Sequence, residues 1–332
     1  MGIKNLSNFI SKRTNNGVEE INISSLNGYK IAIDTSIFLY KFMYSSKFID
    51  NFIQQIYHFK SFNIIPIYVF DGKPPKEKQQ ILDERKTLKD KNLIKIDELE
   101  KKLLNIVDNE EKKKLKKELF ILKRKNINIT KEDIINLKKV FNILGINYIQ
   151  ANCEADLICC QLYKTQKVNG CLSNDMDFLA SGSGLLFTNY NLSNKLNKYN
   201  LSKILQELEL TYDKFVDLCI LCGCDYTTKI RGIGVEKAYI ALKKYNNIET
   251  VIENMCGENK RFKCPSNFEY QIARKLLKND NLENDTYDII NNFEIKNHNN
   301  FNEILPQNID IIKEMTKYTR NLLVNKLIII CN

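Results

Sequence analysis

Seven acidic residues follow short apolar runs or open predicted helices along the chain. They are Asp34, Asp71, Glu154, Asp156, Asp175, Asp177 and Asp225. Carboxylates that converge in one place repel one another unless a cation neutralises them, and hard divalent ions such as Mg²⁺ prefer oxygen ligands. Two such ions about 4 Å apart can activate a water molecule and stabilise a leaving oxygen in phosphodiester hydrolysis. We therefore expect these acids to form a divalent-metal site.

A short later segment combines one of these acids with a glycine turn. It reads LCGCDYTTKIRGIGVEKA over residues 221–238 and contains Asp225, Gly232 and Gly234. A Gly-x-Gly turn exposes backbone N–H groups at the start of the following helix, where the helix dipole favours an anion. A glycine pair at a helix start is equally typical of a purely structural turn. Beside a carboxylate in a basic chain, it predicts a grip on a phosphate backbone.

The positive charge is concentrated in one segment. The net charge is +10, and residues 76–131 hold 18 Lys and Arg against 11 Asp and Glu, which fits a polyanion partner. No Gly or Pro occurs from Lys76 to Leu144, and apolar residues recur there at helical spacing. This pattern predicts a basic helical hairpin, with an ordinary solvated coiled-coil hairpin as the alternative. Lys78 and Arg85 lie two helical turns apart, so both should face whatever Asp71 binds.

Short apolar runs place the acids at the ends of predicted strands. We predict strands at 29–33, 64–70, 146–149 and 168–172, and edge strands or loop at 185–188 and 197–200. The first two end in Asp34 and Asp71, with one helix predicted between them at 36–62. In an open parallel sheet, sites form at the carboxyl ends of the strands. The order of elements predicts an α/β fold with a central, mostly parallel sheet flanked by helices.

Cysteine and histidine usage argues against several other site types. The chain has ten Cys and two His, no signal peptide, and no apolar run that could cross a membrane. We expect an intracellular protein with reduced thiols. Cys219, Cys222 and Cys224 resemble half a zinc site, but without further ligands we interpret them as small buried apolar residues. A phosphate-loop motif of ATP-driven enzymes is absent, and no convincing Ser-His-Asp arrangement is present.

Five motifs make the sequence resemble a known family, the flap endonucleases of the structure-specific 5′ nuclease superfamily, of the xeroderma pigmentosum group G/Rad2 type. They are IAIDTSIFLY, YVFDGKPP, CEAD, LSNDMDFL and LCGCDYTTKIRGIGVEKA, in the family's order, and the likeness runs from Met1 to about Met255. The resemblance implies a PIN-like 5′ nuclease core with a helical arch and a helix–turn–helix DNA-binding module.

The resemblance also implies a role for each matching residue. The metal acids are the seven named above, and the residues assigned to catalysis are Asp34, Asp71, Lys78, Arg85, Glu154 and Asp175. The residues assigned to DNA binding are Gly2, Tyr40, Lys78, Arg85, Arg231, Gly232, Gly234 and Lys237. Tyr40 matches an aromatic residue that stacks on a base, whereas its place in the apolar pattern alone predicts a core residue. Lys78 and Arg85 match basic residues that engage the scissile phosphate.

The implied cofactors are two Mg²⁺ ions, with Mn²⁺ as a substitute, and a K⁺ ion held by backbone oxygens of the helix–turn–helix module. Two departures from the family pattern concern these ions. Asp156 stands where Glu is usual, and its shorter side chain should shift one metal slightly. Lys229 stands where a hydroxyl residue is common, which puts the K⁺ site in question.

The expected domain organisation follows the motifs. The parts are an N-terminal part of the nuclease core at 1–75, a basic helical arch at 76–131, the internal part of the core at 132–225, the helix–turn–helix module at 226–256, and a C-terminal helical extension at 257–332. The expected partner is branched DNA with 5′ flaps, bound by a monomer. The C-terminus lacks a sliding-clamp motif. A nuclear location is expected, or a cytoplasmic replication site if the chain is viral.

We therefore expect a Mg²⁺-dependent flap endonuclease that hydrolyses phosphodiester bonds near the single-strand/double-strand junction by a two-metal mechanism, in DNA replication or repair. A 5′–3′ exonuclease activity is expected beside it. A dominant 5′–3′ exonuclease or a Holliday-junction resolvase of the same superfamily is the alternative. Two further classes are an inactive scaffold that only binds DNA and a ribonuclease built on the related PIN-like sheet.

Overall fold

A seven-stranded sheet runs through the body of the computed structural model, which describes residues 3, 5–44, 48–106, 108–192, 194–257, 260–279 and 284–296. The strand order is β1-β7-β6-β5-β2-β3-β4. The strands are β1 (Val18–Asn22), β2 (Lys30–Asp34), β3 (Ile65–Phe70), β4 (Asn147–Gln150), β5 (Gly170–Leu172), β6 (Leu185–Thr188) and β7 (Lys195–Asn200). The predicted helical pieces at 308–330 lie outside the described residues.

Five adjacent strands of the sheet are parallel. The parallel pairs are β4 with β3, β3 with β2, β2 with β5 and β5 with β6, whereas β7 pairs antiparallel with both β6 and β1. The predicted mostly parallel sheet is confirmed. The prediction of edge strands or loop at 185–188 and 197–200 is wrong, because β6 and β7 lie inside the sheet. The edge on this side of the sheet is β1, a strand without buried residues and with only two apolar residues, which the sequence pattern did not reveal.

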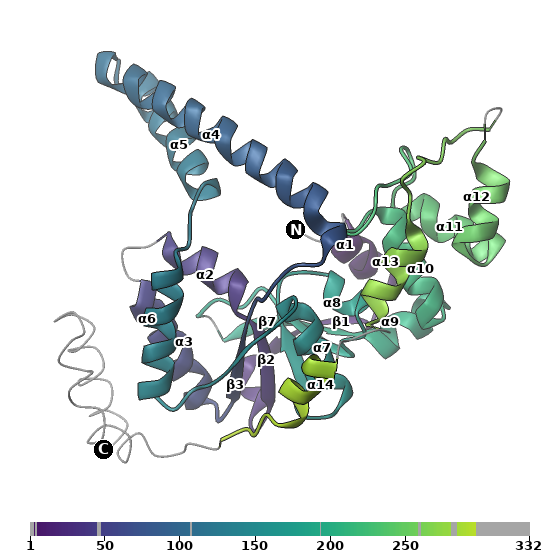
Figure 1. The fold of residues 1–332 in the computed structure, drawn as a ribbon, viewed down its shortest axis with the longest axis horizontal. Helices are drawn as coiled ribbons and strands as arrows, with labels where there is room; N and C mark the ends of the chain where they lie inside the picture. Colours follow the sequence, from purple (N-terminus) through teal and green to yellow (C-terminus); the bar gives the residue numbers. More distant parts are fainter. Residues whose placement is uncertain are drawn as a thin grey trace.

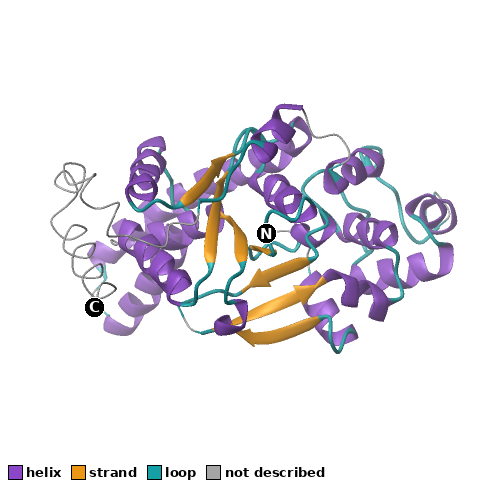
Figure 2. Cartoon of the chain, turned by 90° about the horizontal axis from the view of Figure 1, so that it is seen from below, coloured by secondary structure: helices purple, strands orange, loops and turns teal. Residues whose placement is uncertain are grey.

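Alternate residues of the central strands face two separate hydrophobic layers. Ile31 and Ile33 of β2 pack into one layer, whereas Ala32 between them packs into the other. The first layer includes α2 (Thr35–Met43), α3 (Phe48–Ser61) and α6 (Lys131–Ile143); the second includes α1 (Leu6–Arg13), α7 (Ala155–Lys164) and α10 (Tyr212–Cys222). Strands buried on both faces read as continuous apolar runs, and Figures 1 and 2 show helices on both faces of the sheet.

The single helix predicted at 36–62 is wrong. The structure has α2, which ends at Met43 and is followed by a turn at Tyr44, and then α3, which begins at Phe48. The sequence between them contains Ser45 and Ser46, and serine favours helix caps and turns over helix interiors. Apolar periodicity on both sides of this break concealed it.

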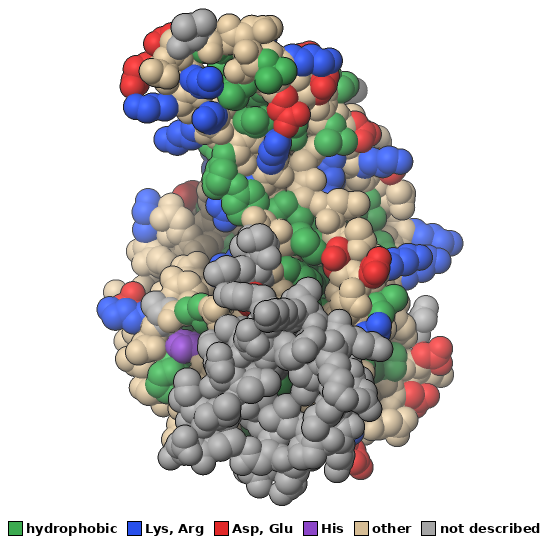
Figure 3. Space-filling view, turned by 90° about the vertical axis from the view of Figure 1, so that its left-hand side faces the viewer, with side chains coloured by type: hydrophobic (Ala, Val, Ile, Leu, Met, Phe, Trp, Pro, Cys, Tyr) green, Lys and Arg blue, Asp and Glu red, His purple; other side chains and the backbone are tan. Residues whose placement is uncertain are grey.

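The predicted basic hairpin is confirmed as two antiparallel helices, α4 (Gln79–Asn105) and α5 (Asn109–Lys125), which project from the body (Figure 1). A 3₁₀ turn, η2 (Lys76–Lys78), leads into α4. Leu99 is buried between the helices, and the Asp108 carboxylate caps α5 by accepting bonds from two amides. Figure 3 shows Lys and Arg side chains spread over this arch with apolar side chains between them.

Most of the remaining helices form a unit beside the sheet (Figure 1). They are α8 (Asp177–Ala180), α9 (Leu201–Leu208), α11 (Val235–Tyr245), α12 (Ile248–Met255) and α13 (Tyr270–Lys278). Helix α14 (Asn284–Asn291) instead packs against α7, and a 3₁₀ turn, η1 (Ile23–Leu26), follows β1. Arg274 of α13 ties this unit together through bonds to Asp217 of α10 and Glu249 of α12, at 2.8 and 3.0 Å. Among the described helices, none combines the length and apolar character needed to span a membrane.

Candidate active site

A cleft of about 510 Å³ opens at the carboxyl ends of the parallel strands. Six of the seven predicted acids line it, and they come from β2, the loop after β3, the start of α7, the loop after β5 and the loop after α10. These are Asp34, Asp71, Glu154, Asp156, Asp175 and Asp225. The topology brings them together because adjacent parallel strands end at the same edge of the sheet. Segments separated by 191 residues in the chain therefore share one site.

Asp34 and Asp71 are held by two serines that the sequence analysis did not identify. Asp34 caps α2 by accepting a bond from the Ser36 amide at 3.0 Å, and its other oxygen accepts from the Ser173 hydroxyl at 3.1 Å. The Ser36 hydroxyl donates to Asp71, whose second oxygen accepts from the Ala155 amide at 2.9 Å. Burial, followed by the charge of Asp71, raises the pKa of Asp34 to about 7.

The close approach of two backbone segments requires the glycine that follows Asp71. A Cβ on Gly72 would lie 2.3 Å from the carbonyl oxygen of Ala151. The Gly72 amide instead donates to the Cys153 carbonyl at 2.7 Å, which joins the loop after β3 to the loop before α7. This contact sets Asp71 beside Glu154.

Glu154 does not act as an ordinary helix cap. It precedes α7, yet its carboxylate makes no capping bond to that helix. One oxygen contacts the Lys78 ammonium, and the other accepts a bond from the buried Tyr226 hydroxyl at 2.9 Å. Burial, followed by the charge of Glu154, raises the pKa of Asp156 well above its usual range. The helix dipole alone therefore does not account for these two acids.

Lys78 and Arg85 both point into the cleft from the base of the arch, as their spacing predicted. Lys78 Nζ contacts Glu154 and lies 3.6 Å from Asp225 Oδ2, and Arg85 Nη2 lies 2.6 Å from the same oxygen. Burial lowers the pKa of Lys78, but the charge of Glu154 and a hydrogen bond to it outweigh that effect, and the net pKa is raised. Lys78 is therefore cationic at neutral pH.

The carboxylates are partly neutralised by these two cations. Within the described residues, no three His, Cys, Asp or Glu side chains are grouped closely enough to hold one metal ion. The donor chemistry nevertheless fits Mg²⁺, since six carboxylate side chains share one cleft. Burial first, and repulsion between the acids second, raise the pKa of Asp34 and Asp156. A divalent cation would relieve that repulsion. Assignment of individual acids as metal ligands stays a prediction.

Asp177 is the one predicted metal acid that does not line the cleft. Its side chain is buried and accepts a bond from the Ile3 amide at 3.0 Å, while its own amide donates to Asp175 at 3.0 Å. Burial, followed by the charge of Asp175, raises the pKa of Asp177 well above its usual range. In this structure Asp177 holds the N-terminal segment and Asp175 in place.

Tyr40 lies in the cleft and not in the core. Its side chain is 46% exposed, and Lys89 Nζ lies 5.8 Å from the centre of its ring. The core interpretation from the apolar pattern is wrong, because α2 turns this position toward the arch. Gly2, the other DNA-binding residue predicted near the site, lies outside the described residues.

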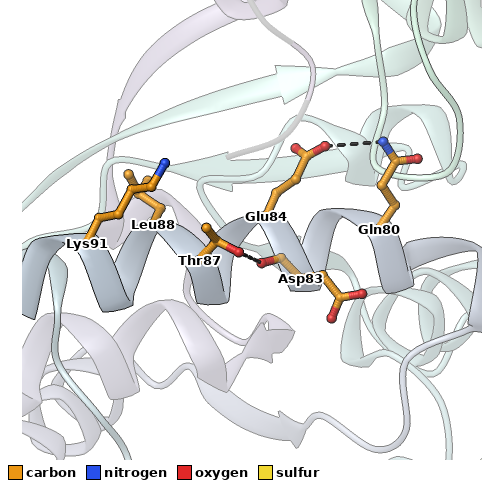
Figure 4. Close-up of a pocket in the computed structure, with 6 residues that line it drawn as sticks. All are labelled: Gln80, Asp83, Glu84, Thr87, Leu88 and Lys91. Carbon is orange, nitrogen blue, oxygen red and sulfur yellow. Dashed lines mark hydrogen bonds between the residues drawn. The ribbon is translucent and has the colours of Figure 1, made fainter.

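A different face of α4 lines a shallow pocket of about 690 Å³ (Figure 4). Its polar groups bond within the helix: Gln80 donates to Glu84 at 3.2 Å, and the Thr87 hydroxyl donates to the Asp83 carbonyl at 2.9 Å. Neither Lys78 nor the Arg85 guanidinium lines this pocket. Arg85 thus lies on another face of α4, the face that meets the active-site cleft.

The glycine turn has the predicted form. Gly232 has a φ of +87°, a conformation that favours glycine, and Gly234 caps α11, which begins at Val235. A Cβ on Gly234 would meet open space, so a ligand has room to approach the first amides of the helix. Lys237 Nζ donates to the Gly232 carbonyl at 2.8 Å. Arg231, beside the turn, is exposed.

Three hydroxyl residues that bond to the cleft acids were missed by sequence reasoning: Ser36, Ser173 and Tyr226. Each lies within two residues of a predicted acid or strand end, so proximity in sequence was a usable signal. Hydroxyl residues beside an acid are also common in turns and caps, and only the tertiary contacts show which acid each one supports.

Known proteins resemble this chain in sequence and in fold. Residues 1–92 match the XPG N-terminal domain, and residues 145–225 match the XPG I-region. The chain is 34% identical over 304 residues to flap endonuclease 1 of Aedes aegypti, covering 86% of this chain and 76% of the relative.

Two solved structures resemble the fold. Flap endonuclease-1 from Methanococcus jannaschii superposes with a TM-score of 0.59 at 21% identity, over 98% of this chain and all of that one. The Holliday junction-resolving enzyme GEN1, solved with product DNA and Mg²⁺, superposes with a TM-score of 0.60 at 17% identity, over 87% of this chain and 68% of that one. The predicted 5′ nuclease core is confirmed, and the chain belongs to the flap endonuclease family of structure-specific DNA nucleases.

Proposed function

We propose that this protein removes 5′ flaps from branched DNA by hydrolysing a phosphodiester bond near the junction of single and double strands. The observation that carries the proposal is the cleft in which six carboxylates meet Lys78 and Arg85 at the base of the arch. Acids alone would suit many metal enzymes. Two cations that line the same cleft as the acids suit the cleavage of a phosphodiester, because they can stabilise negative charge on the phosphate.

The six cleft acids would hold the Mg²⁺ ions, and their oxygen donors match the preference of that metal. When bound, the ions activate water and stabilise the leaving oxygen. A relative in fold, GEN1, was solved with Mg²⁺ and product DNA, which supports this assignment. Two ions per site, replacement by Mn²⁺, and K⁺ at the glycine turn stay predictions.

The protein's own cations would bind the scissile phosphate. Lys78 and Arg85 now contact Glu154 and Asp225, so they exchange these carboxylates for phosphate oxygens when the substrate enters. Ser36, Ser173 and Tyr226 keep the acids oriented during that exchange. Tyr40, exposed in the cleft, offers a ring on which the base next to the cut can stack.

Duplex DNA would be held by the glycine turn and the first turn of α11, where amides and the helix dipole favour phosphate. These contacts would reach only the sugar–phosphate backbone of the DNA. Binding should therefore be independent of base sequence and sensitive to salt. The single-stranded flap would pass the arch, whose surface carries many Lys and Arg side chains (Figure 3).

Cleavage of a 5′-labelled double-flap DNA, with and without Mg²⁺, tests the proposal. We expect metal-dependent release of the flap as one discrete fragment, and loss of that release in Asp175→Asn. Nicked and four-way-junction DNA of the same sequence are compared in parallel. Release of mononucleotides alone, or faster cutting of the four-way junction, would replace the flap assignment by exonuclease or resolvase activity. Binding without any cut would make the protein a DNA-binding scaffold.

A further inference from the structure

Helix α14 packs against the nuclease core, although it belongs to the segment that the sequence predicted as a C-terminal extension. It lies along α7, the helix that begins directly after Glu154 (Figure 1). Ile290 of α14 is fully buried in the same hydrophobic layer as Ile158 of α7. The described part of the extension is therefore built into the core beside the catalytic acids.

Two sets of contacts fix the C-terminal end of α14. Lys167, which follows α7, donates from its ammonium to three carbonyls at and just after the end of α14, at 2.6, 2.9 and 3.0 Å. A cation at this position satisfies carbonyls that have no partner within the helix. Asn147, at the start of β4, exchanges two hydrogen bonds with the backbone of Lys296, at 2.9 and 3.0 Å. Both sets lie at the end of the sheet that is away from the cleft.

Thr286, in the first turn of α14, lies at the opposite end, beside the loop that joins β4 to α7. Its side chain is buried, and its hydroxyl donates to Asn152 Oδ1 at 3.0 Å. The next two residues of α14, Tyr287 and Asp288, are exposed. Within the described ranges, the Asn152 side chain has no hydrogen-bond partner other than Thr286. Thr286 therefore holds this loop from the side of α14.

The loop that Thr286 contacts determines where two cleft acids lie. The carbonyl oxygens of Asn152 and Cys153 accept bonds from the amides of the two residues that follow Asp71, at 3.2 and 2.7 Å. Glu154 is the next residue of the same loop. Asp71 also accepts a bond from the first amide of α7 at 2.9 Å. A displacement of Asn152 would therefore move Asp71 and Glu154 relative to each other.

The two loops have no room to move independently. A Cβ on Gly72 would lie 2.3 Å from the carbonyl oxygen of Ala151 and 2.6 Å from the carbonyl carbon of Asn152. Segments packed this closely transmit a shift of one to the other. The contact at Asn152 is therefore passed on to the loop after β3.

We propose that Thr286 is a positioning residue for the metal site, so that α14 sets the spacing between Asp71 and Glu154. The inference rests on the proposed function, which assigns Mg²⁺ to these acids. Thr286 acts on them through Asn152. Groups that bond directly to a metal ligand typically change metal affinity or activity by about 10- to 100-fold when they are removed. Thr286 acts one step further out, so the expected effect is smaller.

Mg²⁺ binding to the full chain without DNA, measured by calorimetric titration, tests the inference. Thr286→Val removes the hydroxyl and keeps the shape of the side chain, whereas Thr286→Ser keeps the hydroxyl. Thr165→Val is the matched control, because the Thr165 hydroxyl bonds to the Gln161 carbonyl at 2.9 Å at the other end of α7. The melting temperature of each variant reports its folding, and single-turnover cleavage of a double flap gives a second measurement.

We expect Thr286→Val to weaken Mg²⁺ binding about fivefold, the effect of losing one hydrogen bond, and to raise the Mg²⁺ concentration for half-maximal cleavage by a similar factor. Thr286→Ser and Thr165→Val should bind Mg²⁺ as the unaltered protein does. Affinity for flap DNA measured without metal should be the same in all variants, because the glycine turn is unchanged. Unchanged Mg²⁺ binding in Thr286→Val, with a lower melting temperature, would overturn the inference and leave Thr286 a structural role only.

A second comparison tests whether the effect passes through Asn152. Asn152→Ala should weaken Mg²⁺ binding about as much as Thr286→Val does, and the double variant should bind no more weakly than either single variant, because both changes remove the same contact. Effects that add in the double variant would overturn the positioning role.

The two measurements separate this inference from the proposed function. If the unaltered protein binds Mg²⁺ but does not cut the double flap, the proposed function fails, and the Mg²⁺ affinities of the variants still decide the inference. If the unaltered protein cuts the flap and Thr286→Val has the same Mg²⁺ affinity, the inference is overturned and the function stands. If the unaltered protein binds no Mg²⁺, the inference is overturned with the metal assignment.

Discussion

The active-site cleft and a pocket of about 440 Å³ between α11, α12 and residues 260–262, called the α11–α12 pocket, both collect lysine and arginine side chains, but they hold them in opposite ways. In the cleft, Lys78 and Arg85 are paired with carboxylates. In the pocket, Lys237 and Arg261 lie over an aromatic ring and have no carboxylate partner among the described residues. Lys78 and Arg85 must leave their carboxylate partners before they can bind a phosphate. Their availability therefore depends on whether metal ions and substrate occupy the cleft. The cations of the pocket have no carboxylate among the described residues to leave before they bind a phosphate.

This difference indicates that one region serves catalysis and the other serves DNA affinity. Cleft residues should control turnover and metal dependence, whereas pocket residues should control affinity and its salt dependence. Substitutions in the cleft should therefore leave DNA affinity and its salt dependence unchanged, and substitutions in the pocket should leave the metal dependence of turnover unchanged.

Asp71→Asn should reduce cleavage of a double flap at least 1000-fold, or about 4 kcal/mol of transition-state stabilisation, because it removes a charge from the acidic cleft. Flap affinity measured without metal should fall little, since the glycine turn and the pocket are untouched. Single-turnover cleavage and fluorescence anisotropy give the two values. Asp213→Asn, an exposed acid paired with Lys278, is the control. Similar losses in both variants would contradict the assignment.

Arg274→Met should lower the free energy of unfolding by about 3 kcal/mol. It leaves Asp217 buried without its partner, and Asp217 also supports the start of α12 through the Ile248 amide at 3.3 Å. Urea denaturation measures the loss, with the exposed neighbour in Lys275→Met as the control. Because α12 forms one wall of the pocket, duplex affinity should fall as well. A change below about 1 kcal/mol would show that the ion pair is not structural.

Lys78→Ala should reduce turnover about 100-fold, as expected for removal of one group that stabilises charge in the transition state. The same change should strengthen Mg²⁺ binding in the absence of DNA, because Glu154 loses a competing cation. Calorimetric titration with Mg²⁺ separates this from a simple loss of structure. Lys76→Ala, which removes an exposed cation two residues earlier, should change neither value. Weaker Mg²⁺ binding in Lys78→Ala would reject the exchange described above.

Tyr226→Phe should reduce turnover about tenfold and raise the Mg²⁺ concentration needed for half-maximal cleavage. The buried hydroxyl holds one Glu154 oxygen at 2.9 Å, and a hydrogen bond to a charged group contributes about 1.5–3 kcal/mol. Tyr239→Phe is the matched control, since that hydroxyl bonds to the Leu208 carbonyl at 3.0 Å away from the cleft. An unchanged Mg²⁺ dependence in Tyr226→Phe would limit this tyrosine to a structural role.

Local sequence determined much of the framework. Apolar runs that end in Asp34 and Asp71 predicted β2 and β3, because a strand buried on both faces needs continuous apolar side chains. A stretch without Gly or Pro predicted the arch, and the glycine pair predicted the start of α11. These features depend on residues that are close in sequence and belong to the same strand, helix or turn.

Tertiary structure decided the contacts that join distant segments. Local sequence does not show that Tyr40 is exposed, which distant acid Ser36 or Tyr226 supports, or that Asp177 lies outside the cleft. The α11–α12 pocket likewise forms only because Phe262 packs under a turn thirty residues earlier. Periodicity shows which residues share a face of one element, but only packing between elements shows what each face meets.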